Sequence, residues 1–118
     1  MTLEKLKQYR QLQKEATDMK NRIDVLENRI AMSTCNLNNE QIAEWLDEKN
    51  FWIMKRKQIK QALFAIEDWI GALDDSRACL IFRLRYIDGL HWWKVAKKVG
   101  YEERHVRRIH NKIISHLN

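Results

Sequence analysis

Apolar side chains recur at alternating steps of three and four along the first third of the chain. This spacing places them in one stripe along a helix that is predicted to span residues 2–32, with Lys, Arg, Glu and Gln on the other faces. Leu3 and Leu6 lie outside this register, which predicts that the stripe frays or drifts at its start. Because so narrow a stripe cannot form a core alone, a partner helix must cover it. The stripe consists of Tyr9, Leu12, Ala16, Met19, Ile23, Leu26 and Ile30.

A polar stretch over residues 33–39 interrupts this periodicity and predicts a turn. Asn39 is suited to cap the next helix, and Glu40 suits the positive end of that helix. Lys49 and Arg56 interrupt the second stripe, where their stems either lie along the apolar surface or weaken it to set the register. The other positions of the second stripe are Ile42, Trp45, Trp52, Ile59, Leu63, Ile66, Ile70 and Leu73.

Two helices of similar length joined by a short turn favour an antiparallel hairpin over residues 1–72. A parallel coiled coil between chains is the alternative, and both arrangements hold if hairpins from two chains form a four-helix bundle. We therefore expect a homodimer or a higher homo-oligomer. The expected oligomer contacts are Leu12, Met19, Ile23, Leu26, Ile30, Trp45, Trp52 and Ile59. Core or dimer contacts are also expected for the aromatic residues Trp45, Phe51, Trp52, Phe64 and Trp69.

The pattern changes at Ser76, where a shorter helix is predicted to begin. Asp75 or Ser76 is suited to cap its start, and Asp88 followed by Gly89 ends it. Its apolar surface consists of Cys79, Leu80, Phe82, Leu84, Tyr86 and Ile87. The chain contains no proline and three glycines, which disfavours β-hairpins and glycine-rich phosphate loops. The sequence thus predicts an all-α fold in which residues 73–118 form a second domain.

A short helix over about residues 91–98, a tight turn at Gly100 and a longer helix from about Glu102 complete this domain. Gly100 permits a left-handed backbone conformation, and the small Ala96 permits close approach of two helices. The apolar positions of this segment are Val95, Ala96, Val99, Tyr101, Val106, Ile109 and Ile113. Two helices joined in this way form a helix-turn-helix.

The net charge of +6 is concentrated at the C-terminal end of the chain. Residues 77–118 carry ten basic and three acidic side chains, whereas residues 33–76 carry five basic and eight acidic ones. Such a local excess favours a polyanionic partner, which is either nucleic acid or an anionic membrane. No apolar run approaches the roughly 20 residues of a membrane span, so we expect a cytoplasmic protein with no membrane partner.

The segment FRLRYIDGLHWWKVAKKVGYEERHVRRIH resembles region four of primary sigma factors, a helix-turn-helix that reads promoter DNA. It is more similar still to the ArpU/RinA-like late-transcription regulators of phages and prophages of Gram-positive hosts. Those proteins share LRYIDGLSW, a helix with Ile/Val-Ala, and LGYSERxVxRIH. The resemblance covers about residues 73–118. His91 and Glu102 depart from it, because the family has Ser, and Ser or Thr, at these N-cap positions.

This resemblance implies a sequence-specific regulator that binds double-stranded DNA and activates late phage genes, through contact with the host RNA polymerase, in the nucleoid of the bacterial cytoplasm. Matched position by position, it assigns base reading to Glu103, Arg104, His105 and Arg108. Arginine pairs with guanine, and Glu103 accepts from a cytosine amine. Phosphate contacts are expected from Lys94, Lys97, Lys98, Arg107 and Lys112.

Two other functions remain open. One is the DNA-recognition subunit of a phage packaging terminase, although in that family the DNA-binding module usually comes first in the chain. The other is a sigma-like module that binds RNA polymerase without touching DNA.

The residue types that support catalysis or metal binding are poorly arranged. The histidines form no HExxH motif and have no zinc-finger spacing to a cysteine. His105 and His110 are placed on or beside the DNA face, which suggests proton-dependent phosphate contacts. Cys79 is expected in a helix core and Cys35 in the loop, neither with a base partner. We expect no enzyme activity, no metal and no cofactor.

Overall fold

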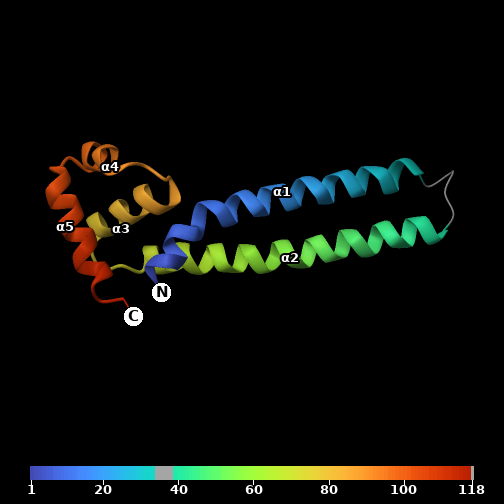
Figure 1. The fold of residues 1–118 in the computed structure, drawn as a ribbon, viewed down its shortest axis with the longest axis horizontal. Coiled ribbons are helices and arrows are strands. Elements are labelled where there is room, and N and C mark those ends of the chain that lie inside the picture. Colours follow the sequence, from blue (N-terminus) through green and yellow to red (C-terminus); the bar gives the residue numbers. More distant parts are fainter. Residues whose placement is uncertain (34–38, 118) are drawn as a thin grey trace. The chain divides into compact units, whose positions relative to one another are not determined.

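The computed structural model describes residues 1–33 and 39–117, and these residues form helices without any strand. The predicted all-α fold is therefore confirmed. The interior of the predicted turn, with Cys35, lies outside the described residues. No helix within the described ranges has an apolar stretch that would let it cross a membrane. The elements are α1 (Leu3–Ser33), α2 (Asn39–Gly71), α3 (Ser76–Phe82), the π-helical η1 (Arg83–Ile87), α4 (Trp92–Val99) and α5 (Glu103–Ile114) (Figure 1).

Contacts divide the chain into two compact units. The boundaries of these units differ from the single boundary predicted at residue 72. Residues 12–62 form one unit, which we call the hairpin unit. Residues 1–11 join residues 63–118 in the other, which we call the helix-turn-helix unit. The first turns of α1 and the last turns of α2 thus belong to the same unit as α3, α4 and α5.

The hairpin unit consists of the part of α1 from Leu12 onwards and the part of α2 up to Ala62, which run antiparallel, side by side (Figure 1). The two polar residues that interrupt the second stripe both bridge the helices. Arg56 Nε donates a hydrogen bond to the carbonyl oxygen of Ala16 at 3.2 Å, and Lys49 Nζ lies 3.3 Å from a carboxylate oxygen of Glu27. Both cationic side chains are half-buried, which favours the first of the two predicted alternatives, in which their stems lie along the apolar surface. The two stripes pair within one chain.

The hairpin unit buries little of its apolar surface. Of the eight residues expected in oligomer contacts, only Leu26 is buried and the other seven are half-buried. Phe51, which was expected in a core or a dimer contact, leaves 51% of its surface exposed. Large apolar side chains are also exposed at Val25, Met32, Leu46, Ile53 and Met54.

The helix-turn-helix unit holds most of the core, and the start of α1 is part of it. Leu6 is 0% exposed and Tyr9 is 2% exposed, so of the two predicted alternatives the stripe does not fray but drifts at its start to include Leu6. The Tyr9 hydroxyl donates to a carboxylate oxygen of Glu67 on α2. Burial, together with this hydrogen bond and the charge of Glu67, raises the pKa of Tyr9 to about 12. The hydroxyl therefore stays a donor, and α1 begins as an anchored helix.

The end of η1 is fixed by the same N-terminal segment. Asp88 and Gly89 follow η1 as predicted, with Gly89 at a φ of +70°. The Arg10 guanidinium donates to the carbonyl oxygen of Asp88 at 2.5 Å. A Cβ atom at Gly89 would collide with the Arg10 side chain. Glycine is thus favoured here for its backbone conformation, and a larger residue would also have to move the flexible end of the Arg10 side chain.

We predict that Gly89→Ala destabilises the protein more than Gly100→Ala. Both substitutions place a Cβ at positive φ, which costs about 1–2 kcal/mol, but the position at Gly100 is otherwise open. Gly89→Ala also displaces the exposed end of Arg10 and weakens its hydrogen bond, a further cost of at most about 1 kcal/mol. Urea denaturation of the two variants measures the difference. In an Arg10→Ala background the two substitutions should cost about the same, and equal costs in the wild-type background would contradict this account.

Candidate nucleic-acid interface

The turn between α4 and α5 is built on Gly100 and Ala96. Gly100 adopts a left-handed conformation with a φ of 84°, and its N–H donates to the Ala96 carbonyl oxygen at 2.9 Å. The N–H of Tyr101 reaches the same carbonyl at 3.2 Å, which closes the end of α4. On either side of this turn, Val95 and Val106 are fully buried. The helix geometry predicted from these residues is confirmed.

Neither helix of this pair begins with a side-chain cap. His91 and Glu102 occupy the N-cap positions of α4 and α5 with extended backbone, and the side chain of neither accepts a hydrogen bond there. These are the two positions at which the sequence departs from the family pattern. The chain thus loses capping interactions that typically contribute about 1 kcal/mol each. By contrast, Asp75 does cap α3, because its carboxylate accepts from the Arg77 N–H at 3.0 Å.

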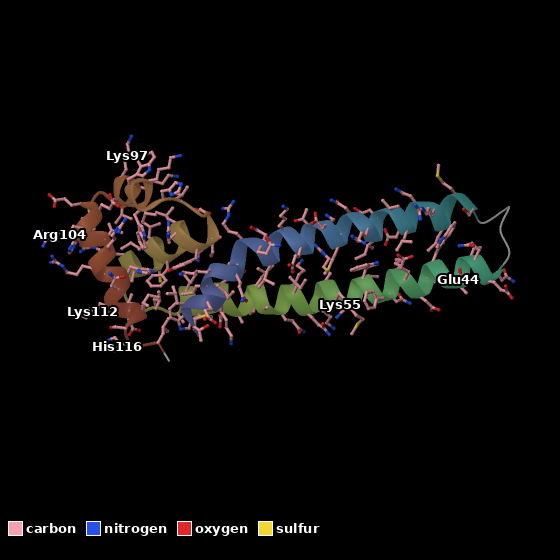
Figure 2. All side chains as sticks on the ribbon, in the orientation of Figure 1. Glu44, Lys55, Lys97, Arg104, Lys112 and His116 are labelled. Carbon is pink, nitrogen blue, oxygen red and sulfur yellow. The ribbon has the colours of Figure 1, made fainter. Side chains whose placement is uncertain are left out.

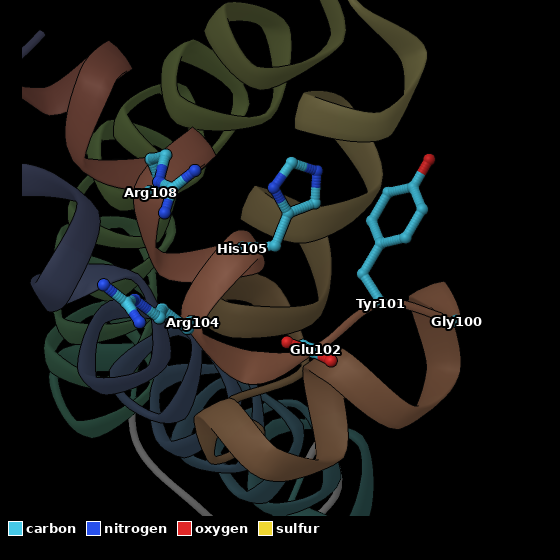
Figure 3. Close-up of a pocket in the computed structure, with 6 residues that line it drawn as sticks. All are labelled: Gly100, Tyr101, Glu102, Arg104, His105 and Arg108. Carbon is cyan, nitrogen blue, oxygen red and sulfur yellow. The ribbon is translucent and has the colours of Figure 1, made fainter.

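The outward face of α5 presents three of the four residues predicted to read bases. Arg104, His105 and Arg108 are exposed, and together with the turn they line a shallow surface pocket. Figure 3 shows the guanidinium groups of Arg104 and Arg108 on one side of the pocket, with the Tyr101 ring on the other. The pocket is lined by Gly100, Tyr101, Glu102, Arg104, His105 and Arg108.

The fourth predicted base reader, Glu103, is placed differently. Its carboxylate lies 2.9 Å from the Arg107 guanidinium, one turn further along α5, and Glu103 does not line the pocket. Arg107, predicted to contact phosphate, also lies over the Trp92 ring at 5.7 Å. The structure thus joins one predicted base reader to one predicted phosphate contact, on the side of α5 that faces Trp92.

The lysines predicted to contact phosphate are all exposed. Lys97 and Lys98 lie in the last turn of α4, and Lys94 lies in its first half, with its ammonium group 5.6 Å from the centre of the exposed Trp93 ring. Lys112 lies two turns beyond Arg104 on α5, about 12 Å along the helix axis. Figure 2 shows Lys97, Arg104 and Lys112 directed away from the ribbon.

Two residues of this surface were missed as site residues by the sequence interpretation. Glu102 lines the pocket although it was considered only as a cap position. Tyr101 was predicted as an apolar position, yet its ring meets the edge of His105 at 5.0 Å and the Arg77 guanidinium at 5.2 Å. The signal for Glu102 was its place directly after the turn, where a side chain projects from the start of the helix.

His110 was predicted to lie on or beside the exposed face of α5 assigned to DNA, but it is buried, so that prediction is wrong. It is 6% exposed, because it follows the buried Val106 by four residues and shares its face of the helix. Its Nε2 lies 2.6 Å from the Tyr86 hydroxyl, its ring stacks on Phe82 at 5.0 Å, and Trp92 meets it edge-on at 4.6 Å. His110 therefore holds α5 against η1, α3 and the start of α4.

The hydrogen bonds of the buried pair His110 and Tyr86 indicate whether the imidazole of His110 is charged or neutral. Burial lowers the pKa of His110, although the hydrogen bond to Asn111 acts in the opposite direction. Burial also raises the pKa of Tyr86. The arrangement that satisfies both rings is a neutral imidazole: Nδ1–H donates to Asn111 Oδ1 at 3.0 Å, and Nε2 accepts from the Tyr86 hydroxyl.

No group of three or more His, Cys, Asp or Glu side chains within residues 1–33 and 39–117 is arranged to hold a metal ion. No protein-family model, curated protein or solved structure matches the chain.

We predict that the folded state loses stability as the pH falls below about 6.5. The unfolded chain binds a proton at His110 near its ordinary pKa of 6.5, whereas the folded chain binds it only at lower pH. Acid therefore favours the unfolded chain, by at most about 1.4 kcal/mol per pH unit for one group. Denaturation curves at pH 7.5, 6.5 and 5.5 measure this loss. His110→Gln retains an acceptor for Tyr86 but cannot titrate, so its stability should change less over this range. An equally pH-sensitive His110→Gln variant would contradict the role given to His110.

Proposed function

We propose that this protein is a sequence-specific transcription regulator that binds double-stranded DNA through α4 and α5. The observation that supports this proposal is the surface of α5, where Arg104, His105 and Arg108 are exposed beside the Gly100 turn. This surface belongs to a segment, residues 77–118, with ten basic and three acidic side chains. A helix held after a tight turn and rich in exposed cations suits the major groove, whose floor is lined with acceptors.

In the proposed complex, α5 enters the major groove with its N-terminal half toward the bases. Arg104 and Arg108 pair with base edges there, because a guanidinium donates two parallel hydrogen bonds to guanine O6 and N7. Lys97 and Lys98 at the end of α4, together with Lys112, contact phosphates on either side of the groove. These phosphate contacts supply affinity and orientation, whereas the arginines supply sequence preference.

The biological setting follows from the resemblance to the ArpU/RinA-like regulators. It suggests that the protein activates late phage genes in the bacterial cytoplasm, with the host RNA polymerase as a partner. Two copies related by a two-fold axis would present two α5 helices to half-sites about one helical turn apart.

The hairpin unit supports the proposed dimer. Its stripes pair within the chain, yet they leave Phe51 and Met54, which share one face of α2, each more than 50% exposed. Exposed aromatic and aliphatic side chains of this size are typical of surfaces that a partner covers. A second copy of the hairpin unit provides such a cover in a four-helix bundle.

We predict DNA binding that weakens steeply with salt, because each neutralised phosphate releases bound counterions. Lys97→Ala should weaken binding to all duplexes alike. It should also make the negative slope of log K against log salt shallower by about one. Arg108→Ala should instead relax the preference for the selected sequence over a random duplex. Fluorescence anisotropy with labelled duplexes at several salt concentrations measures both quantities.

The matched control is Lys57→Ala, which removes one exposed positive charge from the hairpin unit and should change neither the slope nor the preference. If no duplex binds even at low salt, the protein does not act through DNA. The sigma-like module that binds RNA polymerase alone then becomes the better interpretation.

We predict that light scattering gives about twice the 14.3 kDa mass of one chain. Phe51→Glu should raise the dimer dissociation constant about tenfold or more, since it places a charge among apolar contacts. Gln61→Glu adds the same charge at an exposed polar position of α2 and serves as its control. A monomer at all concentrations would contradict the dimer, and a ring-sized oligomer would favour the terminase subunit.

A further inference from the structure

The pocket at the start of α5 contains one carboxylate among its cations, that of Glu102. Glu102 is exposed, and its side chain makes no capping hydrogen bond to α5. It takes part in neither of the ion pairs found within residues 1–33 and 39–117. Both carboxylate oxygens are therefore available to accept hydrogen bonds from a ligand.

Glu103, the next residue, is in the opposite situation. Its carboxylate accepts from the Arg107 guanidinium at 2.9 Å, and it is half-buried. Breaking that pair to reach a base would remove a hydrogen bond that the free protein already has. The position-by-position resemblance assigned base reading to Glu103, whereas the geometry favours its neighbour.

The rest of the pocket supplies donors beside this acceptor. Arg104 and Arg108 lie one turn apart on α5, and Figure 3 shows Glu102 and His105 between these guanidinium groups and the Tyr101 ring. Tyr101 is held from two sides, by the edge contact with His105 and by the Arg77 guanidinium. The wall of the pocket is thus already formed in the free protein, which suits specific recognition.

We propose that Glu102 determines specificity by accepting a hydrogen bond from the exocyclic amine of a cytosine, while Arg104 and Arg108 donate to guanine. This inference rests on the proposed function and adds the class of sequence that is read. In the major groove a cytosine presents only its N4 amine as a donor, and a guanine presents the acceptors O6 and N7. One carboxylate beside two guanidinium groups therefore fits G·C pairs best, because guanine presents both O6 and N7 to a guanidinium and the paired cytosine presents its amine to the carboxylate.

An alternative effect of Glu102 is purely electrostatic. A carboxylate near the phosphates repels every duplex equally, so its removal would strengthen binding to all sequences by the same factor. Base reading differs, because its loss changes the preference at one position of the site. Measuring sequence preference, and not affinity alone, separates the two effects.

The test is selection of bound duplexes from a random pool by the full-length wild type, Glu102→Gln and Glu103→Gln. We expect the wild type to select sites with G·C pairs. Because glutamine pairs bidentately with adenine, Glu102→Gln should shift one cytosine position towards adenine. The preference at that position should change by about fivefold or more, the lower end of the range for a single base contact. Glu103→Gln is the matched control and should select the wild-type sequence.

Thermal unfolding of both variants checks that each remains folded. The inference is overturned if Glu102→Gln selects the wild-type sequence, including the case in which it binds all duplexes more tightly by one factor. It is also overturned if Glu103→Gln alters the same position. If the wild type itself retains no duplex, the proposed function fails first. That result differs from one in which the wild type and Glu102→Gln both select the same specific sequence, which overturns only the role of Glu102.

Discussion

The surface chemistry of this protein depends on the narrow buried stripe of α5. Val106 and His110 fix the rotation of this helix about its axis, because they are the two residues of α5 that are buried among those described. Because successive residues of an α-helix are rotated by about 100°, this rotation determines the direction of every other side chain of α5. Arg104 and Arg108 point outward, while Glu103 and Arg107 lie on the flank nearest Trp92. A hydrophobic residue at position 110 would fill the same space. The imidazole also forms hydrogen bonds to Tyr86 and Asn111, and these define a single orientation of α5 on the helices beneath it.

Much of the fold was predictable because the sequence repeats one signal. Alternating steps of three and four residues predict helices strongly, and glycines at 89 and 100 mark turns that truly need positive φ. The two long helices and the helix-turn-helix were found in this way. The placement of Leu6 was not, because a heptad pattern describes one straight partner. It carries no information on a core assembled from both ends of the chain.

The candidate site was predictable as a set of residues but not as a set of partners. Spacing along α5 separates inward from outward positions, and it correctly placed Arg104, His105 and Arg108 at the surface. Strict application of the same spacing puts His110 four residues after Val106, on the buried face. Its polarity led to the opposite assignment. Arg107 pairs with Glu103, which leaves the carboxylate of Glu102 free. Which of two neighbouring carboxylates pairs with an arginine depends on side-chain geometry, and periodicity does not encode that geometry.

The anchoring of Leu6 and Tyr9 has a consequence for the order in which the protein is made. These residues share a core with residues synthesised more than fifty positions later. The apolar surface of the nascent N-terminus therefore stays uncovered until α2 and the last helices emerge. Contacts of such long sequence separation slow folding and delay the closing step until the later helices have been made. The helix-turn-helix unit thus completes its fold only once residues 1–11 have met the segment that begins at Leu63.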